Sequence, residues 1–288
     1  MNLKFPLSHR GSEPESGVLY LIGTPIGNLE DISIRALNIL KKVSFIACED
    51  TRQTKKILNK FSIKNELISF NNHNSLIKIP RIINGLKEGK SIGLVSDAGM
   101  PSICDPGEEL VNQARLNQID TICIPGPCAA TTAIVSSGFP SSRFIFEGFL
   151  PKKKIEREKI IHEISEREQT TVIFESPHRL IKLLKELKEC LGGEREIEIS
   201  RELTKKFEEH IREDINTAVK LFESREIIGE ITIVVKGIDK KNNSHAINKV
   251  ELKRELNELI KAGLSLSSAS KYLAKKNNRK KSEIYSLY

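Results

Sequence analysis

The feature that most constrains the fold is a repeated alternation of short apolar runs with helical patterns. Four runs, at residues 18–23, 44–49, 91–97 and 121–126, are nearly continuously apolar. Strands that are buried on both faces have this composition, and parallel strands need crossover connections, which are usually helices. Residues 32–42 supply such a helix, with apolar side chains recurring on one side. The first half of the chain is therefore predicted to be an α/β unit with a mostly parallel sheet.

A second series of strands and helices begins near residue 143. Its strand-like runs alternate more strongly between apolar and polar residues, at 143–149, 170–176, 196–200 and 230–235. Such alternation favours an α+β or mixed-sheet unit. Gly, Pro and Ser cluster at 137–143, where the boundary is expected. We predict an N-terminal domain over 17–140 and a C-terminal α+β domain over 141–237.

Charge sets the end of the chain apart from the rest. Residues 240–288 carry 12 Lys and Arg against four Asp and Glu, which accounts for the whole net charge of +8. Residues 238–249 are polar and turn-rich and are predicted to be a linker, while 250–288 contain three short helical patterns typical of a helix-turn-helix module. This partition favours a localised contact with a polyanion such as nucleic acid, although a merely solvated, Lys-rich tail is the alternative.

Several classes of protein are excluded by simple signals. Five cysteines without paired spacing predict reduced thiols, no zinc site and a cytoplasmic location. The longest weakly charged run, 121–138, contains Pro and Gly, so no membrane helix is expected. Residues 1–16 are predicted to be a disordered extension.

Three loops rich in Gly and Pro, at 23–31, 96–107 and 125–133, each follow a predicted strand. In α/β sheets, loops at the carboxyl ends of strands line the ligand crevice. No G-x-G-x-x-G motif occurs, and 85–91 has one residue too few for a phosphate-binding loop. The three loops therefore predict a ligand pocket that is not a dinucleotide or P-loop site.

Three charged clusters are also candidates for a site, and each has a structural alternative. They lie at 48–54, 174–180 and 200–209. The first can simply cap a helix, the second contains a Ser-Pro pair typical of a helix start, and the third can be a charged junction from strand to helix.

Seven motifs occur in the order found in one protein family. They are LYLIGTPIGNLEDISIRAL, ACEDTRQTKKIL, LVSDAGMPSICDPG, IPGPCAATTAIVSSGFP, FIFEGFLP, FESPHRL and RELTKKFEE. Over residues 17–288 the chain resembles the ribosomal RNA small subunit methyltransferase I family, within the tetrapyrrole methylase superfamily. Three departures from that pattern are Met100, Cys128 and Ile228, where the family commonly has Thr, Ser and Lys.

The resemblance implies two α/β domains of the tetrapyrrole methylase type, with S-adenosylmethionine in the cleft between them. It also implies methyl transfer to the ribose 2′-hydroxyl of a cytidine in the decoding region of 16S rRNA, in the small ribosomal subunit, by a homodimer that needs no metal. Carried over to this sequence, the cofactor-binding residues are expected to be Thr24, Pro25, Asp97, Gly99, Met100, Ile103, Cys128, Ala129, Ala130 and Phe174.

A ribose hydroxyl is a poor nucleophile, so a general base would help the transfer. The candidates for catalysis are Glu49, Asp50, Arg52 and Glu175. The candidates for holding RNA phosphates are Arg179, Arg201, Lys271, Lys275, Lys276, Arg279, Lys280 and Lys281. Two other functions are weighed against this one: a methylase of a tetrapyrrole precursor, and a non-catalytic RNA-binding factor for ribosome assembly.

Overall fold

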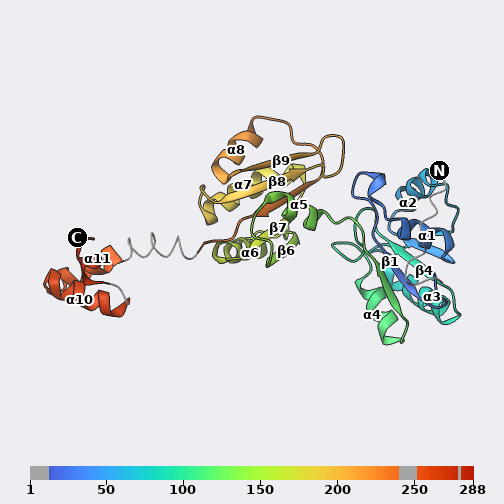
Figure 1. The fold of residues 1–288 in the computed structure, drawn as a ribbon, viewed down its shortest axis with the longest axis horizontal. Coiled ribbons are helices and arrows are strands. Elements are labelled where there is room, and N and C mark those ends of the chain that lie inside the picture. The colour runs from blue at the N-terminus through green and yellow to red at the C-terminus, as the bar shows by residue number, and fades with distance from the viewer. Residues whose placement is uncertain (1–12, 240–251, 278–279) are drawn as a thin grey trace.

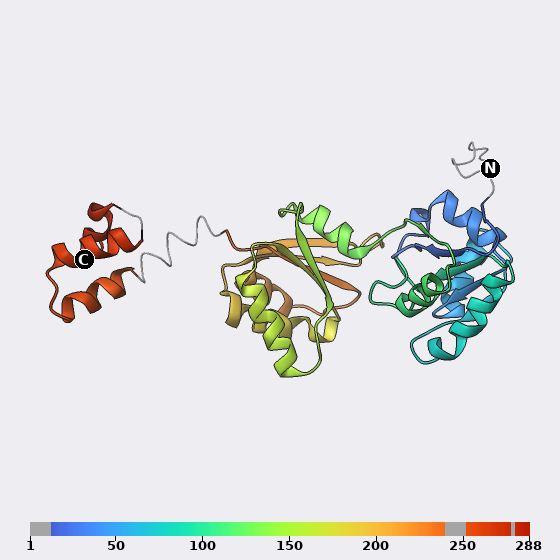
Figure 2. The ribbon, with the colours of Figure 1, turned by 90° about the horizontal axis from the view of Figure 1, so that it is seen from below.

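The computed structural model describes residues 13–239, 252–277 and 280–288. It contains two five-stranded sheets, here called sheet A and sheet B, followed by a group of C-terminal helices (Figure 1). Figure 2 shows the two sheets side by side and the C-terminal helices beyond sheet B.

Sheet A is entirely parallel, with the strand order β3-β2-β4-β1-β5. Its strands are β1 (Leu19–Ile22), β2 (Phe45–Cys48), β3 (Leu67–Ser69), β4 (Ile92–Val95) and β5 (Thr121–Ile124). The prediction of a parallel sheet is confirmed, but the sequence patterns missed β3. That strand is only three residues long, too short to show a period.

Helices cover both faces of sheet A, as continuously apolar strands require. They are η1 (Leu29–Asp31), α1 (Ile34–Lys42), α2 (Thr51–Lys60), α3 (Ser75–Lys87) and α4 (Glu108–Leu116). Alternate residues of β1 enter different cores: Tyr20 packs with α1 and α2, whereas Leu19 packs with α3 and α4. This arrangement leaves the carboxyl ends of the strands uncovered by helices.

Sheet B is mixed, with the strand order β6-β7-β10-β8-β9. Its strands are β6 (Phe144–Phe149), β7 (Thr170–Glu175), β8 (Glu196–Arg201), β9 (Glu209–Asp214) and β10 (Ile231–Val235). Only β6 and β7 are parallel, and β10 lies antiparallel to both β7 and β8. The predicted mixed sheet is confirmed. The structural alternative considered for 200–209, a junction from strand to helix, is wrong, because these residues connect the antiparallel pair β8 and β9.

One face of sheet B is covered by α6 (Lys154–Glu166), α7 (Pro177–Leu191) and α8 (Ile215–Glu223). The other face is covered by α5 (Ala129–Ser137), which the sequence placed in the N-terminal domain. Ala133 and Ile134 of α5 are buried against Val172 and Val234 of sheet B. The chain therefore passes from one sheet to the other before α5, and not at 137–143 as expected. The reason is that a helix rich in Ala, Ile and Val binds whichever apolar face the tertiary structure offers.

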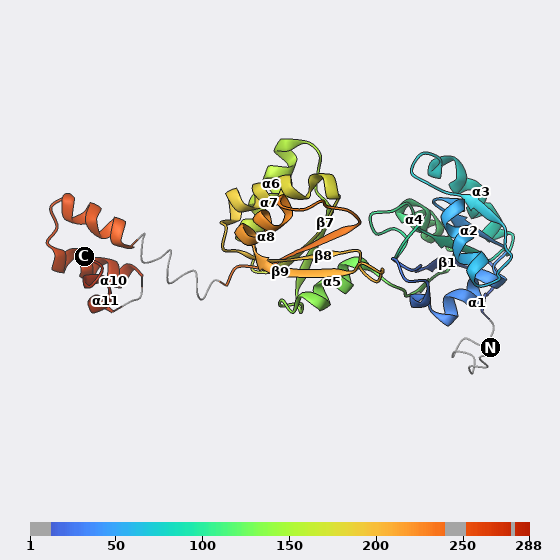
Figure 3. The same ribbon diagram turned by 90° about the horizontal axis from the view of Figure 1, so that it is seen from above.

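The C-terminal module has a core of its own. It consists of helical residues 252–261, α10 (Leu266–Lys276) and α11 (Lys281–Tyr285), seen clearly in Figure 3. Leu256, Leu273 and Ile284, one from each helix, are completely buried together. Of the predicted linker, only residues 238 and 239 lie within the described residues.

Of the predicted N-terminal extension, residues 1–12 lie outside the described part of the chain. Residues 13–16 contact sheet A and its helices: Glu13 pairs with Arg35 of α1, and the Ser16 hydroxyl donates to the Gly89 carbonyl at 2.8 Å. Among the described residues, no helix combines the length and apolar character needed to cross a membrane.

Candidate functional site

The three loops rich in Gly and Pro come together at the carboxyl ends of sheet A. Thr24 and Gly99 exchange two backbone hydrogen bonds, at 2.8 and 3.1 Å, which join the first loop to the second. Gly23 and Gly126 join the first loop to the third, and a Cβ added to Gly126 would lie 2.8 Å from the Gly23 Cα. Parallel strands end at the same edge, so loops far apart in sequence are brought into contact there.

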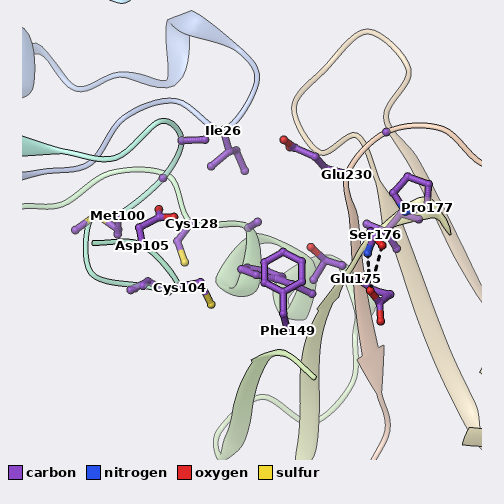
Figure 4. Close-up of a pocket in the computed structure, with 18 residues that line it drawn as sticks. Ile26, Met100, Cys104, Asp105, Cys128, Phe149, Glu175, Ser176, Pro177 and Glu230 are labelled. Carbon is purple, nitrogen blue, oxygen red and sulfur yellow. Dashed lines mark hydrogen bonds between the residues drawn. The ribbon is translucent and has the colours of Figure 1, made fainter. Parts of the chain in front are cut away.

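A pocket with a volume of about 350 Å³ opens between these loops and sheet B (Figure 4). On the side of sheet A, its wall is formed by Ile26, Ala98, Gly99, Met100, Ile103, Cys104, Asp105, Cys128 and Ala129. On the side of sheet B, its wall is formed by Phe149, Phe174, Glu175, Ser176, Pro177, Gly229, Glu230, Ile231 and Thr232. This size suits a drug-sized ligand, and a largely apolar wall with a few polar groups is typical of small-molecule sites.

The register of sheet B explains its contribution to the pocket. Phe149 ends β6 beside Phe174 of the parallel strand β7, and Ile231 begins β10 opposite Glu175. All four residues therefore lie at one end of the sheet. The rings of Phe149 and Phe174 meet edge to face with centroids 5.7 Å apart, which gives the pocket an aromatic wall.

Seven predicted site residues line this pocket, and they are Gly99, Met100, Ile103, Cys128, Ala129, Phe174 and Glu175. Four other predicted cofactor residues do not, and they are Thr24, Pro25, Asp97 and Ala130. Thr24 instead supports the wall from behind through its bonds to Gly99. Ala130 is buried in the contact of α5 with sheet B.

The sequence analysis missed several wall residues as individual candidates. Cys104 and Asp105 lie in the predicted loop 96–107, and Phe149 lies in the FIFEGFLP motif, so these carried a signal. Residues 229–232 carried none, because they form the entry to a late strand that only the sheet topology brings to the pocket.

Asp50 and Arg52 form a closed pair outside the pocket. The Asp50 carboxylate caps α2 by accepting from the Arg52 backbone N–H at 2.8 Å, and it also binds the Arg52 guanidinium at 2.6 Å. These hydrogen bonds lower the pKa of Asp50 to about 2. Such a carboxylate is a weak base, so its role as cap is the one its contacts support.

Three other carboxyl groups cluster beside it at the strand ends, namely Glu49, Asp97 and Asp105. Burial is the largest cause that raises the pKa of each, and repulsion between the carboxylates raises it further. The Asp97 carboxylate accepts from the Asp50 backbone N–H at 2.9 Å. Asp105 is the member of this cluster that reaches the pocket wall.

Glu175 is the predicted catalytic candidate that lies in the pocket wall. Its side chain is almost completely buried, and its Oε1 accepts from the Ser176 backbone N–H at 2.7 Å. Its Oε2 lies 3.3 Å from an Arg179 nitrogen but accepts no well-aligned hydrogen bond. This buried oxygen therefore retains hydrogen-bonding capacity next to the pocket.

Two of the three arginines expected to hold RNA phosphates, Arg179 and Arg201, are engaged within the protein. Arg179 donates to the Leu150 carbonyl at 3.0 Å besides approaching Glu175. Arg201 pairs with Glu209 at 3.0 Å. Their contacts stabilise the site walls, and their availability to phosphates is reduced accordingly.

The lysines of the C-terminal module divide into two groups. Lys276 pairs with Glu255 at 2.9 Å, and Lys281 donates to the Ser267 hydroxyl at 2.8 Å. Lys271, Lys275 and Lys280 are exposed and have no carboxylate partner within the described part of the chain. Arg279 lies outside the described residues. Among the residues that the structure describes, no group of three or more His, Cys, Asp or Glu side chains could hold a metal ion.

Comparisons with known proteins agree with this architecture. Residues 18–219 match the family model described as tetrapyrrole (corrin/porphyrin) methylases. The chain is 48% identical to the ribosomal RNA small subunit methyltransferase I of Thermotoga maritima, over 77% of this chain and 99% of that protein. It is 39% identical to the protein of the same name from Bacillus subtilis, over 99% of this chain and 98% of the relative.

Solved structures confirm the predicted fold at low sequence identity. A cobalt precorrin-4 methyltransferase aligns with a TM-score of 0.59 and 15% identity, covering 76% of this chain and 95% of that one. A uroporphyrin-III C-methyltransferase from Thermus thermophilus aligns with a TM-score of 0.53 and 19% identity, covering 76% and 94%. At such identity these likenesses concern the fold alone.

Proposed function

Because the chain belongs to the ribosomal RNA small subunit methyltransferase I family of tetrapyrrole methylases, we propose that it methylates the ribose 2′-hydroxyl of a cytidine in the decoding region of 16S rRNA. Enzymatic methylation of ribosomal RNA follows from the family; the atom, the nucleotide and the residues involved are the proposal. The observation that carries it is the pocket in which loops from both sheets meet.

The pocket fits S-adenosylmethionine as the methyl donor. Gly99 in the wall lets the backbone approach a ligand closely, and the contact of Gly23 with Gly126 holds two of the loops together. Phe149 and Phe174 supply an aromatic surface for the donor's adenine. Two carboxylates in the wall, Asp105 and Glu230, complement its positive charges. Once bound, this donor supplies an electrophilic methyl group on a sulfonium.

The chain's own residues then have two tasks. The first is to hold the ribose oxygen about 3–3.5 Å from the methyl group in a site without water, and such orientation is worth roughly 7–11 kcal/mol. The loops of sheet A and the edge of sheet B perform this task because each is fixed by backbone bonds to its sheet. The second task is to accept the proton of the hydroxyl.

We assign proton acceptance to Glu175. Its Oε2 lies 3.3 Å from Arg179 without a well-aligned donor, and the assignment requires this buried side chain to turn toward the pocket to accept from the ribose hydroxyl. Asp105 faces the same pocket from sheet A and is the second candidate, because burial raises the pKa of this carboxyl and so strengthens it as a base. Glu49, Asp50 and Arg52 do not line the pocket.

The RNA is held at a second place, the C-terminal module. Its exposed lysines, Lys271, Lys275 and Lys280, face solvent and can bind phosphates, whose contacts make affinity depend on salt. The concentration of the whole net positive charge in residues 240–288 favours RNA over a small tetrapyrrole precursor as the acceptor. The family membership and the built pocket favour an enzyme over a non-catalytic assembly factor. A homodimer and a cytoplasmic location stay predictions.

The decisive experiment is methylation of purified small ribosomal subunits that lack the modification, with donor labelled in the methyl group. Nucleoside analysis is expected to recover the label as 2′-O-methylcytidine. Label on a base, or on a nucleoside outside the decoding region, would contradict the assignment. A mock preparation from cells that do not express the protein, taken through the same purification, serves as the control for contaminating activity.

A further inference from the structure

The loop between β8 and β9, residues 202–208, is longer and more constrained than the connection of two antiparallel strands requires. Hairpin loops usually have two to five residues, and this one has seven. Glu202 and Thr204 adopt left-handed conformations, with φ of 53° and 65°. Such strain at residues other than glycine persists only where the surroundings impose it, and it is concentrated at functional sites.

Hydrogen bonds hold this loop in place. The Glu202 carboxylate accepts from the Lys205 ammonium at 2.8 Å and from the Glu230 backbone N–H at 2.9 Å. The Thr204 backbone N–H donates to Glu208 at 3.1 Å. The loop is therefore preorganised by its own charged side chains.

The same loop contacts residues on both sides of the pocket. The Thr204 hydroxyl accepts from the Asn28 backbone N–H at 3.0 Å, and Leu203 is buried in the cluster that contains Ile26. Lys205 binds the carboxylate of Glu230 at 3.1 Å. Ile26 and Glu230 are wall residues on opposite sides of the pocket, as Figure 4 shows. The loop thus forms part of the pocket's rim.

Two neighbouring side chains of the loop are left outside this network. Phe207 is 63% exposed, unusual for so large an apolar side chain. Lys206 has no carboxylate partner in the part of the chain that the structure describes, whereas Lys205 is paired twice. The Lys206 ammonium lies 5.4 Å from the centre of the Phe207 ring, so a cation and an aromatic face are offered together at the rim.

We propose that Lys206 and Phe207 form a platform for an unstacked nucleotide of the RNA substrate, with Phe207 stacking on the base and Lys206 binding the phosphate. Single-stranded RNA is recognised in this way, because every base has a face that can stack on an aromatic ring. The proposal deepens the proposed function and rests on it.

The chemistry of the acceptor requires such a platform. A ribose in a stacked helix cannot enter a pocket between two sheets, so the nucleotide must be drawn out and held while it reacts. A base held at the rim by Phe207 would leave its own or the adjacent ribose facing the wall that contains Glu230 and Glu175. Phe207 is therefore a positioning residue, and Glu175 remains the proton acceptor.

Affinity for RNA tests the proposal separately from catalysis. The probes are a labelled single-stranded fragment of the decoding region and the same fragment annealed to its complement, measured by fluorescence anisotropy. Phe207→Ala is expected to weaken binding of the single strand about 5- to 150-fold, the range that loss of one stacked base represents. Duplex binding is expected to change little.

Matched variants separate stacking from mere bulk. Phe207→Trp is expected to keep the affinity and Phe207→Leu to lose it. Lys206→Ala is expected to reduce the slope of log affinity for RNA against log salt concentration by about 0.7. This is the contribution of one phosphate contact on a single strand. The control is Phe144→Ala, since Phe144 is an exposed phenylalanine at the opposite end of sheet B.

Two results would overturn the platform: unchanged single-strand affinity in Phe207→Ala, or equal affinity in Phe207→Leu and Phe207→Trp. Subunit methylation by the same variants adds a second readout, in which KM for the subunit rises and donor binding stays as in the wild type. Failure of the wild-type protein to methylate subunits would instead refute the proposed function, while its affinity for RNA would still decide the platform.

Discussion

Adding a single Cβ atom at the contact between Gly23 and Gly126 would test whether the site depends on the close packing of its loops. An alanine at position 126 would place its Cβ 2.8 Å from the Gly23 Cα and 2.9 Å from its carbonyl carbon. Ordinary contacts between carbon atoms lie near 3.5–4.0 Å, so the two loops would have to separate by most of an ångström. Both neighbours are backbone atoms, and no side chain can rotate away.

The expected cost of this overpacking is about 1–3 kcal/mol in the free energy of unfolding. At about 2–4 °C for each kcal/mol, the melting temperature of Gly126→Ala should fall by roughly 2–12 °C. Displacement of the loop that carries Cys128 and Ala129 should also weaken donor binding, and an error of about 1 Å costs about 100-fold in methyl transfer.

Calorimetry with S-adenosylmethionine and thermal denaturation measure the two effects. The matched control is Gly85→Ala in α3, whose added Cβ would lie 3.5 Å from the Ile92 Cδ1, an ordinary contact. Neither glycine has a positive φ, so neither change forces an alanine into a left-handed conformation. In a helix the change to alanine stabilises by about 0.5–1 kcal/mol. A Gly126→Ala protein that binds donor and melts like the wild type would refute this account of the site.

Three further outcomes are expected. Glu175→Gln should bind donor normally and lower single-turnover methyl transfer by about 10²–10⁴-fold, and an unchanged rate would remove Glu175 as the base. Asp105→Asn should raise the melting temperature of the free protein at pH 7 but hardly at pH 4. Burial raises the pKa of Asp105, so its charged form lowers the stability of the folded protein progressively as pH rises above about 4. Equal changes in melting temperature at pH 7 and pH 4 would contradict this. Replacing Lys271, Lys275 and Lys280 together by Ala should reduce the slope of log affinity for RNA against log salt concentration by about two to three. An unchanged slope would show that these three lysines make no phosphate contacts.

Much of the site was accessible from the sequence because glycine and proline carry local information. The loops at 23–31, 96–107 and 125–133 could be assigned to one edge once the strands before them were predicted to be parallel. The charged cluster at 48–54 was likewise a candidate for the site. Its chemistry could not be predicted, because the pairing of Asp50 with Arg52 depends on side-chain geometry.

In the C-terminal module, too, the sequence predicted the elements but not the pairing of their side chains. Its charge and its three helices could be read from the sequence. Which lysines face solvent and which are bound, as Lys276 is to Glu255 across 21 residues of chain, could not.

Local composition and period, which depend on a few neighbouring residues, were enough to predict buried parallel strands, loops rich in Gly and Pro after them, and a basic terminus. Long-range packing was needed to show that α5 covers sheet B, that residues 229–232 complete the pocket, and that residues 202–208 contact Asn28 and Glu230 beside it. Those outcomes arise from contacts between segments up to 176 residues apart, where the apolar faces and hydrogen-bonding groups of one sheet select their partners on the other.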